Sequence, residues 1–151
     1  RFCRRGLAMR DRAAGRRHAR ASCRAASGRR VSEAGRKKSR IFLVEDEFLL
    51  AHGLECDLTE SGFSVLGPFY RLGDARAAAA AASFDLALLD VNLDGEMVFP
   101  LARDLRERGI KFVFLTGYNP SHLPEDLRQA PRLAKPYDPK VLIRTLNALL
   151  A

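Results

Sequence analysis

Residues 84–95 read Phe84-Asp85-Leu86-Ala87-Leu88-Leu89-Asp90-Val91-Asn92-Leu93-Asp94-Gly95. A short apolar run ends on the carboxylate of Asp90, and a polar loop that contains glycine follows it. A continuous apolar run bounded by turn residues is typical of a strand buried on both faces. Asp90 then lies at the carboxyl end of that strand, where open α/β sheets place their ligands. This stretch alone leaves two interpretations open, a solvated residue at a strand end or a reacting group that binds metal or phosphate.

The same alternation of apolar runs and amphipathic stretches continues through residues 40–151. The pattern predicts strands at 41–44, 63–66, 85–90, 111–115 and 132–134. It predicts helices at 48–61, 72–82, 100–108 and 138–150, and a short, loose helix at 121–129, which Pro124 interrupts. Strands that alternate with helices indicate a parallel sheet with helices on both faces. We therefore expect a flavodoxin-like (βα)5 doubly wound fold of the α/β class, with strand order 2-1-3-4-5.

Charge divides the chain near residue 40. Residues 1–40 carry fifteen Arg or Lys and two acidic residues, a net charge of +13, whereas residues 41–151 carry eleven basic and sixteen acidic residues, a net charge of −5. The first part has few large apolar residues and no periodicity, so we expect a disordered basic tail at 1–39 and one domain at 40–151. The tail has four interpretations: a solvated segment without a specific role, a nucleic-acid-binding arm, an organelle transit peptide, or a stretch outside the natural product.

Cysteine usage and hydropathy indicate the compartment. The three cysteines, Cys3, Cys23 and Cys56, form neither a disulfide framework nor a set with metal-ligand spacing. No apolar stretch approaches the roughly 20 residues of a membrane-spanning helix, and no signal-peptide core is present. We therefore expect a cytoplasmic protein without membrane contact.

Polar residues follow four of the five predicted strands: Glu45 and Asp46, then Asp90, Thr116 and Lys135. The carboxyl ends of parallel strands lie at one edge, so the acid pair should face Asp90 across the crevice between the first and third strands. Neighbouring carboxylates repel one another unless a cation neutralises them, and oxygen ligands suit Mg²⁺. A lysine and a hydroxyl can bind phosphoryl oxygens. Each residue alone also has an ordinary explanation as a solvated lysine, a turn former or a helix cap, but together they predict a site that forms an aspartyl phosphate.

Four motifs then point to a family. They are Leu43-Val44-Glu45-Asp46-Glu47, Leu88-Leu89-Asp90-Val91-Asn92-Leu93, Leu115-Thr116-Gly117 and Ala134-Lys135-Pro136. In this order and spacing, the chain resembles the receiver domain of two-component response regulators over essentially all of residues 40–151.

The resemblance implies a role for each matching residue. Asp90 would accept a phosphoryl group from a histidine kinase or a histidine phosphotransfer protein. Asp46 and Asp90 would coordinate Mg²⁺ through their side chains, and Asn92 through its backbone carbonyl. Glu45, in place of the more usual aspartate, would act through water. The remaining expectations are that Thr116 and Lys135 bind the phosphoryl oxygens and that the Lys135-Pro136 bond is cis.

One region departs from the common pattern. Receivers usually carry a Tyr or Phe three residues before the lysine, as an aromatic switch, but that position holds Arg132. Tyr118 instead follows Thr116-Gly117 directly. The run from Phe114 to Tyr118, with the loop 94–100, resembles a subgroup of stand-alone receivers with a Phe-Ala-Thr-Gly-like fourth strand, found chiefly in alphaproteobacteria. We therefore expect Tyr118 and the segment 119–131 to form the element that responds to phosphorylation.

The sequence thus predicts a single-domain response regulator with output through protein contacts or a phosphorelay. It would be a signalling module and not an enzyme, since it catalyses only its own phosphorylation and dephosphorylation. Its partners would be a kinase or phosphotransfer protein and a downstream protein, with nucleic acid only through the tail, and the apolar last helix is compatible with a homodimer.

Three alternatives stand beside this prediction: a degenerate receiver that binds partners without phosphorylation, a nucleic-acid binder, and a small Mg²⁺-dependent phosphatase. The phosphatase is disfavoured because the second residue after Asp90 is Asn92 and not an aspartate.

Overall fold

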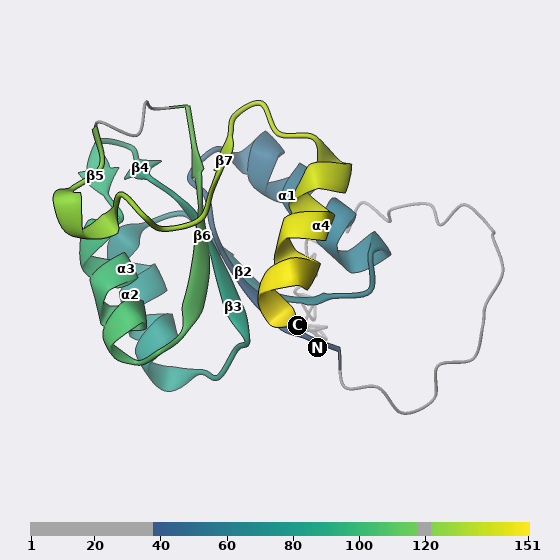
Figure 1. Ribbon diagram of the computed structural model, residues 1–151, viewed down its shortest axis with the longest axis horizontal. Coiled ribbons are helices and arrows are strands. Elements are labelled where there is room, and N and C mark those ends of the chain that lie inside the picture. Colours follow the sequence, from purple (N-terminus) through teal and green to yellow (C-terminus); the bar gives the residue numbers. More distant parts are fainter. Residues whose placement is uncertain (1–37, 118–121) are drawn as a thin grey trace, which may run out of the picture. The chain divides into compact units, whose positions relative to one another are not determined.

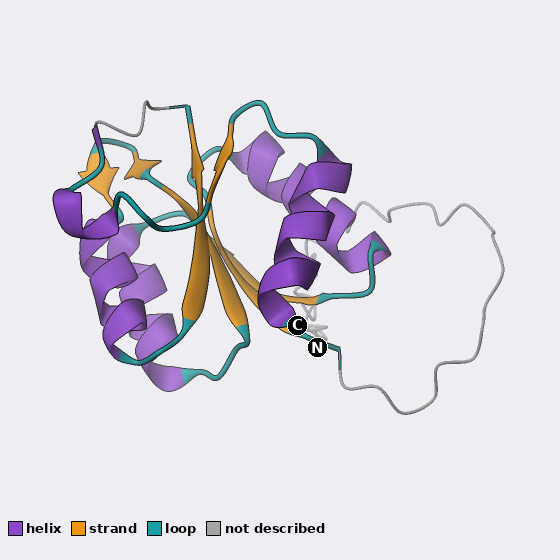
Figure 2. Cartoon of the chain, in the orientation of Figure 1, coloured by secondary structure: helices purple, strands orange, loops and turns teal. Residues whose placement is uncertain are grey.

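The computed structural model describes residues 38–117 and 122–151, which contain a five-stranded parallel sheet (Figures 1 and 2). The strand order is β2-β1-β3-β6-β7. In chain order these strands are the first to fifth of the main sheet, so the expected flavodoxin-like order 2-1-3-4-5 is confirmed. The strands are β1 (Arg40–Val44), β2 (Ser64–Phe69), β3 (Leu86–Asp90), β6 (Lys111–Thr116) and β7 (Arg132–Ala134).

Four α-helices cover the two faces of this sheet within the described residues. They are α1 (Phe48–Glu60), α2 (Leu72–Ala81), α3 (Phe99–Glu107) and α4 (Pro139–Leu150). Figure 1 shows α2 and α3 together on one face, and α1 and α4 on the other. No helix of the described part of the chain is long and apolar enough to cross a membrane.

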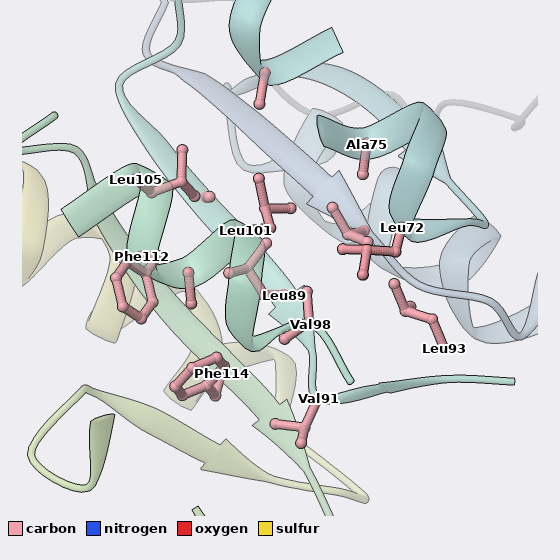
Figure 3. Packing of buried hydrophobic residues seen from close by; sticks show 14 of the residues in the cluster. Leu72, Ala75, Leu89, Val91, Leu93, Val98, Leu101, Leu105, Phe112 and Phe114 are labelled. Atoms are coloured by element: carbon pink, nitrogen blue, oxygen red, sulfur yellow. The ribbon is translucent and has the colours of Figure 1, made fainter. Parts of the chain in front are cut away.

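Alternating strand residues form two separate cores, because successive side chains of a strand point to opposite faces. In β1, Phe42 and Val44 pack on the side of α2 and α3, whereas Ile41 and Leu43 pack on the side of α1 and α4. Figure 3 shows the first core, in which Leu101 and Leu105 of α3 face the strands. Burial on both faces explains why the central strands read as continuous apolar runs.

The second strand is longer than the sequence predicts. The predicted strand ends at residue 66, before Gly67-Pro68, yet β2 continues to Phe69, which pairs with Val44 after a shift in register. Proline is tolerated here because β2 is an edge strand. Gly67 has φ +118°, and a Cβ at this position would lie 2.6 Å from the carbonyl oxygen of Leu43. Only glycine allows this close passage of the two strands.

A small hairpin occupies the loop after β3, where the sequence analysis predicts only a polar loop. Strands β4 (Asn92–Leu93) and β5 (Glu96–Met97) pair in antiparallel fashion. Asp94 and Gly95 form the turn with φ +52° and +90°. Two-residue hairpins favour positive φ at both positions, which is why Asp-Gly is common there. This dipeptide was the sequence signal for the hairpin.

The segment between β6 and β7 contains less helix than its neighbours. Its described part holds the 3-10 turn η2 (Glu125–Leu127) in place of the short helix expected at 121–129. Pro124 immediately precedes the turn. Arg103 and Arg106 of α3 bind the carboxylate of Asp126 at 2.9 and 3.1 Å. These ion pairs tie η2 to α3.

The ion pair predicts a pH-dependent contribution to stability. The hydrogen bond from Arg103, together with the charges of Arg103 and Arg106, lowers the pKa of Asp126 to about 2. A lowered carboxylate pKa stabilises the fold at pH values above the ordinary pKa of 3.8. This stabilisation is lost as the pH falls through about 2. Asp126→Asn should therefore lower the melting temperature at pH 6 but have little effect at pH 2, as measured by thermal unfolding. Glu107→Gln, at an exposed position of α3, is the control, and an equal effect of Asp126→Asn at both pH values would contradict the prediction.

Candidate functional site

The polar residues expected at the strand ends lie at one edge of the sheet. Glu45 and Asp46 directly follow β1, and Asp90 is the last residue of the adjacent strand β3. Thr116 is the last residue of β6, and Lys135 follows β7. The fold thus delivers one or two polar residues from each of four neighbouring strands, as the parallel topology requires.

Lys135 bridges the carboxylates of two of these strands. Its ammonium nitrogen lies 2.7 Å from Glu45 Oε2 and 2.7 Å from Asp90 Oδ2. Glu45 is completely buried, and Asp90 is only 8% exposed. Buried carboxylates are costly unless they are paired and hydrogen-bonded. The ammonium group of Lys135 therefore allows both acids to occupy this buried position.

Burial changes the acid–base properties of this cluster. It raises the pKa of Glu45 to about 7 because it penalises the charged carboxylate; the hydrogen bond from Lys135 opposes this rise, and the charge of Asp90 adds to it. Burial alone would lower the pKa of Lys135, but the hydrogen bonds and charges of Asp90 and Glu45 outweigh it and raise that pKa. Lys135 is therefore a permanent cation at physiological pH.

The hairpin after β3 holds the third carboxylate. The backbone N–H of Asp94 donates to Asp46 Oδ2 at 2.9 Å, so the turn of the hairpin fixes Asp46. The turn is itself fixed, because Gly95 N–H donates to the side-chain oxygen of Asn92 at 2.9 Å. The family resemblance predicts a backbone role for Asn92, whereas the contribution of Asp94 is not among the predictions. The Asp94-Gly95 turn signal could have identified this contribution.

The three carboxylates fit a divalent cation. One oxygen atom each of Glu45, Asp46 and Asp90 lies within 4.8 Å of the others. Oxygen donors in this number suit Mg²⁺, which also retains water ligands. With all three acids ionised and Lys135 protonated, the cluster carries a net charge of −2, which one Mg²⁺ would balance. Charge and ligand type therefore agree with the predicted metal, and the described residues contain no other cluster of three such ligands.

Backbone and side-chain contacts position Lys135 itself. Its N–H donates to the carbonyl oxygen of Thr116 at 3.0 Å, which links the last two strands of the sheet at the site. The Lys135–Pro136 bond is cis, as expected. The hydroxyl of Tyr137 then donates to Asp57 Oδ2 of α1 at 3.3 Å. The backbone of Lys135 is thus bonded to β6, and the chain two residues later is bonded to α1 through Tyr137.

The residues that depart from the common receiver pattern have different outcomes. Arg132 is exposed on β7, and its guanidinium donates to the carbonyl oxygen of Arg128 at 3.0 Å. Tyr118 lies outside the described residues, so its expected role stays a prediction. Thr116, which matches the common pattern, is buried at the end of β6, with 3% of its surface exposed.

Among known proteins, solved structures match this chain, whereas no protein-family model and no curated protein does. Among solved structures, SdrG from Sphingomonas melonis Fr1 is 36% identical with a TM-score of 0.66, and the match covers 76% of this chain and 98% of SdrG. The BeF3-activated conformation of SdrG from Pseudomonas melonis Fr1 is 35% identical with a TM-score of 0.64. This match covers 74% of this chain and 96% of that SdrG chain.

A more distant match shows the fold alone. The chemotaxis response regulator CheY4 of Vibrio cholerae is 23% identical with a TM-score of 0.66, and the match covers 75% of this chain and 99% of CheY4. SdrG, by contrast, is matched at a higher identity over nearly its whole length. The chain therefore belongs to the family of response regulator receiver domains.

Proposed function

We propose that the chain is a phosphorylation-dependent receiver in which Asp90 accepts a phosphoryl group from a histidine kinase or a histidine phosphotransfer protein. A carboxylate oxygen of Asp90 forms a bond to phosphorus while the phosphorus–nitrogen bond of the donor's phosphohistidine breaks. The electron pair of that bond remains on the donor's imidazole. Phosphoryl transfer of this kind depends on positioning and on charge neutralisation more than on covalent chemistry by the protein.

The contact between Lys135 and Asp90 carries this proposal. The ammonium nitrogen lies 2.7 Å from an oxygen of the buried Asp90 carboxylate. A lysine ammonium is a compact point charge with three donors, so it suits a phosphoryl group that replaces one carboxylate contact. The Thr116 hydroxyl, on the neighbouring strand, would donate to another phosphoryl oxygen.

The acidic cluster would hold the metal ion of this reaction. Asp46 and Asp90 would bind Mg²⁺ through their side chains and Asn92 through its carbonyl, while the buried Glu45 would act through water. When bound, Mg²⁺ would neutralise the charge of the phosphoryl oxygens. The hydrogen bond from Asp94 to Asp46 leaves the other carboxylate oxygen of Asp46 for the ion.

The proposal extends to the domain organisation and to the signalling role of the chain. Residues 40–151 would form the receiver domain, and residues 1–39 a basic tail that takes no part in phosphorylation. Phosphorylation adds about two negative charges beside Lys135, which would change the surface seen by a downstream protein. The domain would act in the cytoplasm as a signalling module, and not as an enzyme with a separate substrate. The structure of activated SdrG shows that this relative adopts a BeF3-activated conformation.

The first prediction concerns covalent modification. Incubation with acetyl phosphate and Mg²⁺ should add the mass of one phosphoryl group to the protein, because Asp90 is the buried nucleophile beside Lys135. Asp90→Asn should show no adduct in intact-mass measurements. Asp74→Asn, on the exposed face of α2, is the matched control and should be modified like the parent protein.

Two results would contradict this prediction. An adduct that persists in Asp90→Asn would place the phosphoryl group elsewhere. No adduct from acetyl phosphate or from a panel of phosphorylated histidine phosphotransfer proteins would favour a receiver that binds partners without phosphorylation.

A second prediction concerns the metal. At about a hundredfold excess over its dissociation constant, Mg²⁺ should stabilise the folded protein by roughly 2.7 kcal/mol. Thermal unfolding with and without Mg²⁺ measures this effect. Asp46→Asn should lose most of it, because it removes one carboxylate charge, whereas Asp74→Asn should retain it. Equal stabilisation of both variants would show that Mg²⁺ binds outside the acidic cluster.

A further inference from the structure

Helix α1 presents a histidine, a glutamate and a cysteine on one turn, away from the acidic cluster. His52 Nε2 lies 3.9 Å from Cys56 Sγ, and His52 Nδ1 lies 4.0 Å from Glu55 Oε2. The side chains of His52 and Glu55 are 50% and 44% exposed, and Cys56 is partly exposed. Residues three and four apart are neighbours on a helix, so this arrangement follows directly from the sequence spacing.

The distance between the imidazole and the thiol suits a shared metal ion. Zinc binds cysteine sulfur at about 2.3 Å and histidine nitrogen at about 2.0–2.1 Å. The observed separation of 3.9 Å is shorter than the sum of these two bond lengths. One ion can therefore contact both atoms in the bent arrangement of a tetrahedral site. Imidazole and thiolate are also the ligands that zinc and similar ions select over magnesium.

The carboxylate of Glu55 lies 4.0 Å from His52 Nδ1, near enough for an electrostatic contact but too far for a hydrogen bond. A histidine ligand commonly donates its other ring N–H to a carboxylate, which fixes the ring orientation and the tautomer. Here Glu55 stands on the Nδ1 side of the ring, while Nε2 faces the sulfur of Cys56. The carboxylate therefore favours the tautomer that leaves Nε2 available as a ligand.

The negative charge of α1 favours binding of a cation near Cys56 and disfavours a role for Cys56 as a reactive nucleophile. The helix contains Glu55, Asp57 and Glu60 but no Lys or Arg. Cysteines become nucleophilic near positive charge or at a helix N-terminus, whereas Cys56 lies in the second half of the helix among carboxylates. The same carboxylates attract a divalent cation, which would itself stabilise the thiolate.

The helix surface beside the pair has room for an ion and its remaining ligands. Gly53 lies next to His52 in sequence and three residues before Cys56. Apart from its chain neighbours, His52 and Leu54, and the backbone of its own helix, a Cβ at this position would meet no atom within 4 Å. Water molecules or a second protein can therefore complete the coordination.

We propose that His52 and Cys56 bind a divalent ion of the zinc class on the outward face of α1, with Glu55 as a positioning residue for the imidazole. This site is separate from the Mg²⁺ cluster in ligand chemistry, because it uses nitrogen and sulfur in place of carboxylate oxygens. It does not depend on the phosphorylation of Asp90.

The test uses Cd²⁺ as the probe, because Cd²⁺ bound to a thiolate produces a charge-transfer absorption band in the ultraviolet. The full-length chain should carry Cys3→Ser, Cys23→Ser and His18→Ala throughout, so that residues 1–37 contribute neither thiol nor imidazole. Excess Mg²⁺ keeps the acidic cluster occupied. A saturable band should appear on titration with Cd²⁺, and Zn²⁺ should abolish it by competition.

Substitutions then assign the ligands. Cys56→Ser should abolish the band, and His52→Ala should weaken Cd²⁺ binding by about a hundredfold, because two linked ligands bind far more tightly than one. Glu55→Gln should weaken it by roughly tenfold, as is usual for outer contacts of a metal site. His122→Ala, at another exposed histidine of the described chain, is the matched control and should bind like the parent. Circular dichroism verifies that each variant is folded.

Two outcomes would overturn the proposal. If His52→Ala and His122→Ala bound Cd²⁺ with the same affinity, the thiol would be acting alone and no chelating pair would exist. If Cys56→Ser retained the affinity of the parent for Zn²⁺ measured by calorimetry, the ion would be bound at other residues.

Discussion

The ammonium group of Lys135 is the contact on which the acidic edge of the sheet depends. It lies between two carboxylates that are almost fully removed from water, at 2.7 Å from each. Without it, Glu45 and Asp90 would be two like charges in a buried position, which would favour protonation of at least one of them. Together β1, β3 and β7 bring these three side chains within hydrogen-bonding distance, which the proposed function requires.

The surrounding fold keeps Lys135 in place even though its strand is short. β7 contains three residues at the sheet edge, so pairing with β6 alone gives it few contacts. Further support comes from the chain after it, where Tyr137 reaches Asp57 of α1 and Asp138 caps α4 through the N–H of Lys140 at 2.8 Å. Leu142 and Leu146 of α4 then pack into the core shared with α1. The lysine is therefore anchored by the helix layer as much as by the sheet.

Much of this arrangement was predictable because it rests on periodicity and on strand ends. The buried strands are apolar runs, and each functional residue directly follows or ends one, so the sheet order and the edge with the acids could be inferred before any contact was known. The parts that were missed depend on local backbone geometry. Gly67 lets β2 pass close to Leu43, which no apolar pattern indicates. The hairpin at Asp94-Gly95 is too short for a strand pattern, although it fixes Asp46. The 3-10 turn η2 contacts α3 through the ion pairs of Asp126, which connect residues twenty or more positions apart.

Charge balance links this geometry to the proposed chemistry. With all three acids ionised and Lys135 protonated, the cluster carries a net charge of −2, which a divalent cation would balance. Phosphorylation would convert the Asp90 carboxylate into an acyl phosphate, which removes one negative charge from that side chain and adds about two on the phosphoryl oxygens. Lys135 has three N–H donors and uses two of them for Glu45 and Asp90. It could therefore keep its contact with Glu45 while transferring the other from Asp90 to the phosphoryl group. The same ammonium is hydrogen-bonded to the buried Glu45, so the new charge would first change the interactions at the ends of β1 and β7. These two strands are followed in the chain by α1 and α4.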